Sequence, residues 1–574
     1  MCGSLERNES QESAQSVKVH IGTYHERKLK ILKEKRGKKM QEFKRQNLKR
    51  RTTYFKSDTM VEDLKASILK VLSEASTVGA TAKQIAFRTG YDVQIVSRQL
   101  EELHQEGKVE RIGRKLWLLA PFKDINRDPE FRSPDWYIRL FKYQEGLTLE
   151  KYPGKITFSD NGNKSIHRWS PYVQGFSASF VETILDRYRI GRNNCVLDPF
   201  VGCGTVLVCA RLRGAKSIGV DLMPLMTFAS KVKTRWDLDI KKIETNLAKI
   251  RKAVKESPSI SPPFLKETYR QFDKEVLVNL LKLKQSIWAI HDQSIRELFQ
   301  LAFASILIEC SRLKRSPCLS YVKEKIVQKE APFVLFERKV QQMKNDLLQV
   351  QKRRHEWGPE PQIICEDSRK VKYEPQSIDI AITSPPYVNG MDYVINYKIE
   401  MAWLDMVKSY SELATLKNRM VACDNISRKV IKEFANKNME VRDEWLLDIV
   451  KRIETKITQK GSYRRDDMHL IVQKYFEDLY PVLRNVYEGL KQGGRFVIVI
   501  GDSLIAGTYI PTDLILARLA KEIGFKIERI EIARKRRSGQ RKSFVLRESV
   551  LTLIKGEACR PKKLDDFLDQ SDLS

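Results

Sequence analysis

Short apolar runs alternate with helical segments in two parts of the chain, and this alternation predicts a parallel α/β sheet. Residues 195–198 and 217–220 are two such runs, and residues 206–213 between them have the apolar spacing of a helix. Apolar runs of this length that are separated by helices are typical of strands buried on both faces. The same pattern predicts further strands at 363–368, 378–382, 493–500, 526–532 and 548–554, and a helix at 511–523 that Gly524 ends.

Between these two parts lies a long segment, 226–361, whose apolar residues recur at helical spacing. One such stripe, with charged residues on the opposite side, consists of Leu277, Leu280, Leu281 and Ile287. We therefore predict a helical insertion at 226–361 and a sheet domain made of residues 166–225 and 362–556.

Residues 57–120 have the pattern of a small separate domain with three helices and a hairpin. Thr81 and Asp92 are placed to cap the second and third helices, and two short apolar runs follow at 109–112 and 116–119. The pattern resembles a winged helix, which places part of its third helix in a DNA groove. The side chains expected to face the groove are Gln94, Ser97 and Arg98. The alternative is a winged helix that contacts another protein.

Three flanking segments lack such patterns. Residues 1–56 are rich in Lys and Arg and predict a basic, flexible arm, which binds phosphates or is simply solvated. Residues 121–165 are aromatic and irregular, and we expect a linker that packs on the next domain. Residues 557–574 form a short acidic tail.

The formal net charge of +31 over 574 residues favours a polyanionic partner, with nucleic acid first. A membrane surface is the alternative, but no apolar run reaches the roughly 18 residues that a spanning helix needs. The nine cysteines are scattered without a Cys-x-x-Cys pair, so we expect neither a disulfide framework nor a metal site. The polar N-terminus has no signal-peptide pattern, and we expect a cytoplasmic protein.

A Pro-Pro step directly follows the apolar run 378–382, in the sequence Thr383-Ser384-Pro385-Pro386-Tyr387. Two prolines cannot continue a strand ladder, so the chain is expected to form a stiff, extended corner with unpaired carbonyls. A hydroxyl precedes this corner and an aromatic ring follows it. Such a corner can grip a flat ring that carries an NH2 group, and its residues are the candidate catalytic residues: Ser384, Pro385, Pro386 and Tyr387.

A glycine turn joins the first predicted strand to its helix. The turn reads Asp198-Pro199-Phe200-Val201-Gly202-Cys203-Gly204-Thr205, and the next strand ends at Asp221. Glycines let the backbone approach a ligand, and a carboxylate at a strand end suits a ribose diol. A dinucleotide site would have a third glycine near Leu207, and a phosphate loop would have Gly-Lys-Ser/Thr; the sequence has neither. The expected ligand is a nucleoside without a phosphate chain.

Together these segments resemble the amino-methylating DNA methyltransferases that use S-adenosylmethionine. Residues 198–205 are similar to that family's cofactor loop, and residues 382–387 match its catalytic motif in the form typical of cytosine-N4 enzymes. Adenine-N6 enzymes more often carry Asp at the position of Ser384. The resemblance covers about 166–225 and 362–555, and it implies a Rossmann-like methyltransferase sheet with helices on both faces and two antiparallel last strands.

The resemblance also implies a role for each matching residue. Ser384 and the carbonyl of Pro385 would accept hydrogen bonds from the target amino group, and Tyr387 would stack on a flipped base. Asp221 would hold the ribose hydroxyls, and Asp367 would accept from the adenine amino group of the cofactor. The implied cofactor-binding set is Asp198, Pro199, Phe200, Gly202, Gly204, Thr205, Asp221, Asp367 and Ser368. The segment 169–176 resembles the one that covers the methionine end of the cofactor.

Two other segments bear on the reaction. The connection between the last two predicted strands, 534–542, is dense in cations that could clamp DNA phosphates beside a flipped base: Arg536, Arg537 and Arg541. Its alternative is a solvated charged turn. Carbon-5 methylation would need a thiolate, but Cys318 lies in the predicted helical insertion, so we interpret it as structural.

Several functions stay open at this level. Many cytosine-N4 enzymes place the catalytic motif before the cofactor loop, whereas here the loop comes first, and this order leaves adenine-N6 methylation open. An RNA base methyltransferase and a DNA-binding regulator on a decayed methyltransferase fold are further alternatives. The preferred hypothesis is a site-specific DNA methyltransferase of cytosine N4, with a cognate restriction endonuclease as a partner.

Overall fold

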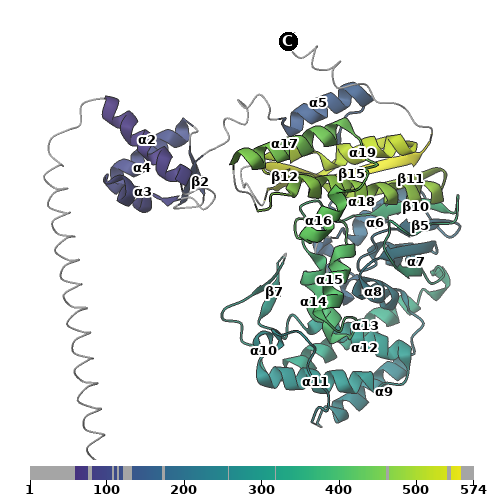
Figure 1. Ribbon diagram of the computed structural model, residues 1–574. Coiled ribbons are helices and arrows are strands. Elements are labelled where there is room, and N and C mark those ends of the chain that lie inside the picture. The colour runs from purple at the N-terminus through teal and green to yellow at the C-terminus, as the bar shows by residue number, and fades with distance from the viewer. Residues whose placement is uncertain are drawn as a thin grey trace, which may run out of the picture. The chain divides into compact units, whose positions relative to one another are not determined.

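The computed structural model describes residues 58–74, 80–106, 109–112, 116–119, 132–170, 175–255, 257–316, 318–460, 464–538 and 544–556. The predicted arm at 1–56 and tail at 557–574 lie outside these residues. The chain divides into two compact units, unit 1 up to residue 131 and unit 2 from Arg132 onward (Figure 1).

Unit 1 contains three helices and a three-stranded antiparallel sheet. The helices are α2 (Asp58–Glu74), α3 (Ala82–Thr89) and α4 (Val93–Gln105), and the strands, in sheet order, are β1 (Ala80–Thr81), β3 (Leu116–Leu119) and β2 (Val109–Ile112). Both predicted caps are confirmed, because Thr81 and Gln84 form a reciprocal capping box and the Asp92 carboxylate accepts the backbone N–H of Gln94. Ile68, Leu72 and Leu100 are fully buried in its core. The assignment as a winged helix stays a prediction.

Unit 2 is built on an eight-stranded sheet with the order β4-β14-β15-β11-β10-β5-β6-β9. The strands are β4 (Glu150–Lys151), β5 (Cys195–Asp198), β6 (Lys216–Asp221), β9 (Gln362–Cys365), β10 (Ile378–Thr383), β11 (Leu490–Gly501), β14 (Phe525–Arg537) and β15 (Val545–Lys555). The strands from β9 to β11 pair in parallel, whereas β15 is antiparallel to both of its neighbours. The predicted Rossmann-like sheet with an antiparallel end is therefore confirmed.

Helices cover both faces of this sheet. Apolar side chains of β5, β10, β11 and β15, such as Val196, Ile382 and Val550, are buried against α6 (Ala178–Arg187) and α7 (Thr205–Leu212). On the other face lie α18 (Met468–Gly489) and α19 (Thr512–Ile523) (Figure 1). Burial on both faces explains why these strands are continuous apolar runs rather than alternating ones.

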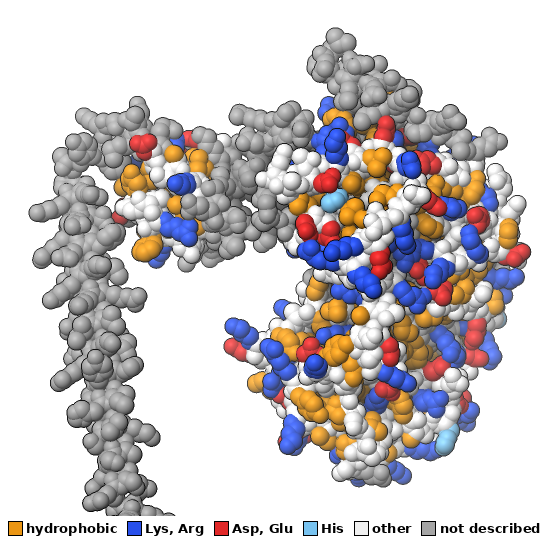
Figure 2. All heavy atoms as spheres, viewed as in Figure 1, with side chains coloured by type: hydrophobic (Ala, Val, Ile, Leu, Met, Phe, Trp, Pro, Cys, Tyr) orange, Lys and Arg blue, Asp and Glu red, His pale blue; other side chains and the backbone are white. Residues whose placement is uncertain are grey.

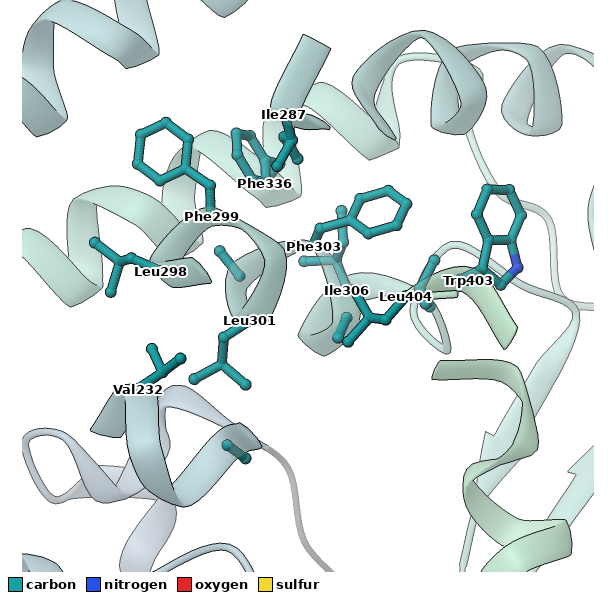
Figure 3. Close-up of a cluster of buried hydrophobic side chains, with 14 of the residues drawn as sticks. Val232, Ile287, Leu298, Phe299, Leu301, Phe303, Ile306, Phe336, Trp403 and Leu404 are labelled. Carbon is teal, nitrogen blue, oxygen red and sulfur yellow. The ribbon is translucent and has the colours of Figure 1, made fainter. Parts of the chain in front are cut away.

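The segment between β6 and β9 forms a helical lobe, defined here as residues 224–361. Its helices are α8 (Pro224–Thr234), α9 (Ile240–Ala253), α10 (Thr268–Gln271), α11 (Lys274–Trp288), α12 (Gln293–Ile306) and α13 (Ala331–Gln351). Figure 3 shows how Phe299, Phe303 and Phe336 meet in its core, with Trp403 of α14 (Tyr393–Trp403) beside them. The lobe also contains a short hairpin, β7 (Leu313–Arg315) and β8 (Leu319–Tyr321), that the helical pattern did not predict. Cys318 lies at the turn of this hairpin.

After α14 the chain adds more helices before returning to the sheet. They are α15 (Tyr410–Arg419), α16 (Arg428–Ala435) and α17 (Glu444–Lys460), and a small hairpin of β12 (Ser503–Ile505) and β13 (Thr508–Ile510) follows β11. No described helix combines the length and the apolar character that crossing a membrane requires.

The predicted linker at 121–165 needs correction, because its described part is built into unit 2. Helix α5 (Pro134–Glu145) contacts α19, where Arg518 donates to the side-chain oxygen of Gln144 at 2.9 Å. Strand β4 pairs in parallel with β14 and forms one edge of the sheet. The strand has two residues, which is too short for an apolar pattern to reveal it.

Candidate functional site

The carboxyl ends of β5, β6, β9 and β10 surround a pocket that opens to solvent. Crevices at this edge of an open α/β sheet are the usual ligand sites of such folds. Six of the predicted site residues line the pocket: Phe200, Asp221, Asp367, Ser368, Ser384 and Pro386. The other lining residues are Leu222, Met223, Met226, Tyr393, Arg419, Met420 and Val421. The two motifs that the sequence singled out therefore meet in one cavity.

Asp198 lies beneath this pocket, at the end of β5, and is buried. One of its carboxylate oxygens accepts the hydroxyl of Thr383 at 2.7 Å and the backbone N–H of Phe200 at 3.1 Å. Burial raises the pKa of Asp198 to about 7, and the charge of Asp221 adds to this shift. Asp198 is thus a bridge between the two motifs, and it is not among the residues that line the cavity.

The glycine turn after Asp198 depends on residues without a side chain. Gly204 has a φ of 81°, and a Cβ at this position would lie 2.8 Å from the hydroxyl oxygen of Ser230 on α8. The next residue, Thr205, begins α7. The turn is therefore packed between the sheet and α8, as a close backbone approach to a ligand requires.

Asp221, at the end of β6, braces this turn from the side. Its carboxylate accepts the backbone N–H of Gly202 at 2.9 Å and that of Met223 at 2.9 Å. Burial raises the pKa of Asp221 to about 6, although these two N–H groups favour the ionised form. The carboxylate also lines the pocket, so its remaining lone pairs are available to a ligand.

Asp367 follows β9 and is held by a cation that the sequence analysis missed. Arg369 donates to both oxygens of Asp367, at 2.8 and 2.7 Å, and also reaches Asp478 of α18 at 2.5 Å. Burial raises the pKa of Asp367, but Arg369 outweighs burial and the pKa is lowered overall. The neighbouring Ser368 donates to the carbonyl of Pro199, which ties β9 to the cofactor loop.

The proline corner is fixed by groups from two other elements, α18 and β15. The hydroxyl of Tyr475 on α18 donates to the carbonyl of Pro386 at 2.9 Å. The hydroxyl of Tyr387 donates to Glu548 of β15 and is hydrogen-bonded by the side chain of Ser384. Burial, followed by the charge of Glu548, raises the pKa of Tyr387 well above its usual value. Tyr387 itself is not among the pocket-lining residues, whereas Tyr393 is.

The predicted cover of the methionine end, residues 169–176, is only partly described, because residues 171–174 lie outside the described ranges. Trp169 is fully buried, and its indole N–H donates to Asp346 of α13 at 2.9 Å. Asp346 also accepts the backbone N–H of Ile166 and the guanidinium of Arg168. Trp169 therefore anchors the helical lobe and does not line the pocket.

The predicted DNA-contacting residues fall into two groups. On α4 of unit 1, Gln94 and Arg98 are exposed, Ser97 is half-buried, and Arg98 lies 3.3 Å from Glu102.

In unit 2, Arg536 and Arg537 are in strand β14, which corrects the predicted loop at 534–542. The strand continues because Arg536 pairs with Leu546 and Arg537 with Val545 of β15. Arg536 donates to the carbonyl of Asp502 at 2.6 Å, and Arg541 lies outside the described residues. Figure 2 shows Lys and Arg side chains gathered near the middle of one face of unit 2.

Comparison with known proteins finds several type II methyltransferases. The type II methyltransferase M.BsoBI of Geobacillus stearothermophilus is 24% identical over 482 residues, which are 72% of this chain and 93% of that protein. The chain is a homologue of type II methyltransferases. M.AvaI of Nostoc sp. is 20% identical over 65% of this chain and 82% of its own length, and M.MvaI of Kocuria varians is 22% identical over 57% and 74%. No protein-family model matches the chain.

Solved structures add little to this assignment of the chain as a methyltransferase homologue. An S-adenosylmethionine-dependent methyltransferase from Methanosarcina mazei aligns with a TM-score of 0.23 and 7% identity, over 65% of this chain and 97% of that one. So low a score does not establish a shared fold.

Three residues of the candidate site were not found by sequence reasoning. Arg369, Tyr475 and Glu548 each contact a predicted site residue from a position that carries no motif. Arg369 lies two residues after Asp367, and this nearness to a predicted site carboxylate was the only local signal.

Proposed function

We propose that this chain is a site-specific DNA methyltransferase that uses S-adenosylmethionine to methylate the exocyclic N4 amino group of cytosine. The observation that carries the proposal is the shared pocket of Ser384, Pro386, Asp221 and Asp367. An acceptor-rich corner for an amino group and a carboxylate suited to a ribose diol thus face one cavity. Homology to type II methyltransferases supports the same reaction class.

The residues of the pocket fit S-adenosylmethionine. Asp221 retains acceptor capacity for the two ribose hydroxyls, and Phe200, Met223 and Met226 offer apolar surface for a flat base. The pocket is open to solvent, and its acidic groups complement a positively charged ligand. Asp367 and Ser368 would hold the adenine end, and the turn from Asp198 to Thr205 would hold the methionine end. When bound, the cofactor supplies a reactive methyl group on a sulfonium.

The corner then positions the target amino group. The nitrogen lone pair of cytosine N4 is delocalised into the ring, which makes it a poor nucleophile. The hydroxyl of Ser384 and the carbonyl of Pro385 accept its two N–H bonds and favour a more pyramidal nitrogen with a freed lone pair. The base reaches the pocket only after it leaves the helix, and stacking on an aromatic ring, that of Tyr387 at the corner or that of Tyr393 in the pocket lining, would offset part of the unstacking cost.

The choice of base and nucleic acid is tested directly by mass spectrometry. DNA and RNA are incubated separately with the protein and S-adenosylmethionine, and their nucleosides are then analysed. We expect N4-methylcytosine from DNA, which Ser384 favours over the Asp of most adenine-N6 enzymes. If N6-methyladenine appears instead, the target base is adenine. If only RNA is methylated, the substrate is RNA and not DNA. If no methylated nucleoside is found in either, the proposal is contradicted.

The remaining features fit a role on duplex DNA. The α4 residues Gln94, Ser97 and Arg98 and the exposed cation Arg537 of β14 supply groups for bases and phosphates. A restriction endonuclease that cuts the same site is the partner that this role implies. Such an endonuclease would be tested by comparing its cleavage of untreated DNA with its cleavage of DNA that this protein has already methylated.

A further inference from the structure

The hydroxyl of Tyr387 connects the catalytic serine to a buried carboxylate. On one side it is hydrogen-bonded by the side chain of Ser384, and on the other it donates to an oxygen of Glu548. Ser384 lines the pocket, whereas Glu548 lies on β15 and is 7% exposed. The three side chains therefore form a continuous row from the cavity to the antiparallel end of the sheet.

Sheet register places Glu548 for this contact. Its backbone pairs with Gly501 of β11 on one side and with Arg534 of β14 on the other. A Cβ on residue 501 would lie 2.7 Å from the ring of Tyr387, so the glycine makes room for the ring to reach Glu548. Glycine at position 501 is thus explained by the ring of Tyr387, which occupies the space that a side chain would need.

The far end of the row leads to solvent. The second carboxylate oxygen of Glu548 accepts from the guanidinium of Arg534, whose side chain is 47% exposed. The row thus runs from a hydroxyl in the pocket to a carboxylate with an exposed neighbour.

We infer that Ser384, Tyr387 and Glu548 form a proton relay that carries away the proton which the target amino group loses on methylation. This inference rests on the proposed function. Directly after methyl transfer the nitrogen carries the new methyl group and both of its original hydrogens, whereas the neutral product keeps only one of these hydrogens. That proton passes to Oγ of Ser384, the proton of Ser384 passes to Oη of Tyr387, and the proton of Tyr387 passes to Oε1 of Glu548. Both hydroxyls are restored, and the carboxylic acid then returns its proton to water beside Arg534.

The test compares single-turnover methylation of DNA by the wild type and by Tyr387→Phe and Glu548→Gln, with nucleoside mass spectrometry and a pH series. Tyr387→Phe keeps the ring and removes only the relay oxygen. We expect both variants to lose about 100-fold in rate, as is usual for removal of a positioned acid–base group. Their rates should rise with pH, because hydroxide then takes the proton, and the dissociation constant of S-adenosylmethionine should be unchanged.

A matched control exists on the same sheet. Glu528 of β14 accepts the hydroxyl of Tyr188 at 3.0 Å and pairs with Arg495, which reproduces the Tyr–Glu–Arg arrangement outside the set of pocket-lining residues. Glu528→Gln should methylate DNA at the rate of the wild type. A wild type that methylates nothing refutes the proposed function. If the wild type methylates DNA and Tyr387→Phe does so at the same rate, the relay alone is refuted. The same holds if Tyr387→Phe is slower but has the pH profile of the wild type. If Glu548→Gln does not fold, the result for Tyr387→Phe decides.

Discussion

Thr383 donates its hydroxyl hydrogen to the carboxylate of Asp198 across 2.7 Å. Thr383 is the residue before Ser384, and Asp198 is the first residue of the glycine turn. Both side chains are buried, at the ends of the adjacent parallel strands β10 and β5. This hydrogen bond holds the proline corner and the glycine turn in a fixed relation.

Replacing Thr383 by Val should destabilise the protein by about 1–3 kcal/mol at pH 8, because the ionised Asp198 then loses a buried donor. The loss should be smaller at pH 5.5, since Asp198, with a pKa of about 7, is then protonated. Urea unfolding at the two pH values measures the difference. Thr383→Ser keeps the hydroxyl and serves as the control. Equal losses for Val at both pH values would contradict the role assigned to the charge.

Cofactor binding should depend on pH through Asp221, whose pKa is raised to about 6 by burial. The cofactor is cationic and its ribose needs an acceptor, so it binds better when Asp221 is ionised. Affinity should therefore rise from pH 5 to pH 7, by up to about tenfold per pH unit below 6, and binding should release a proton. Calorimetry in two buffers of different ionisation enthalpy measures both. Asp221→Asn should bind more weakly and without this dependence. A wild-type affinity that is level across the range would refute the assignment.

The raised carboxyl pKa values also affect stability. In the folded state Asp198 keeps a proton up to about pH 7, whereas its ordinary value is 3.8, so the folded protein holds a proton that the unfolded chain has lost. The stabilising effect of this proton is complete below pH 3.8 and is lost as the pH rises towards 7. The unfolding free energy of Asp198→Asn should therefore fall less between pH 4.5 and pH 7 than that of the wild type. Parallel curves would contradict the prediction.

Ser384→Ala should lose most methylation activity, about 100-fold or more, because one of the two acceptors for the target amino group is removed. Its affinity for S-adenosylmethionine should be unchanged, and equilibrium dialysis measures this separately from activity. Ser377→Ala is the matched control, since Ser377 lies just before the opposite end of β10 and donates to the carbonyl of Glu374 at 2.6 Å. Weakened cofactor binding in Ser384→Ala would count against its assignment to the target base.

Asp346→Ala should be strongly destabilising, by about 3–5 kcal/mol, because a fully buried carboxylate is removed from donors on four residues. The indole of Trp169, the backbone of Ile166, the guanidinium of Arg168 and the hydroxyl of Ser165 would lose this partner. Glu337→Ala on the same helix, α13, breaks only an exposed ion pair with Arg251 and should cost less than about 1 kcal/mol. Thermal or urea unfolding compares the two variants. Similar stability for both would show that Asp346 does not anchor the lobe.

Neutralising Lys535 and Arg537 together should make the salt dependence of DNA binding shallower, by about one unit of slope per lost phosphate contact. Both are exposed on β14, whereas Arg536 is used inside the protein and is unsuitable for this test. Lys249 and Lys252, exposed on α9 in the helical lobe, are the matched control pair. An unchanged slope for Lys535→Ala with Arg537→Ala would exclude a phosphate clamp at this edge.

The sequence predicted the parts of the site that lie within single segments. Asp198, Asp221 and Ser384 each stand at the end of an apolar run, and local periodicity is enough to place them at one sheet edge. Glu548 and Tyr475 could not be found in this way, because their partners are far along the chain and only sheet register or helix packing brings them together. Strand β14 was predicted too short since its last residues are charged, yet they pair with β15 as regularly as the apolar ones.

The position of β4 has a consequence for the newly made chain. Residues 150–151 form the edge strand, but their partner in β14 begins only at Phe525, and β15, which β14 needs as a neighbour, begins at Val545. Synthesis proceeds from the N-terminus, so the ribosome releases the cofactor loop long before the strand that carries Glu548. During that interval Tyr387 has no carboxylate to hold its hydroxyl. A nascent chain can therefore fold its glycine turn early, but it completes its proline corner only when translation has passed residue 548.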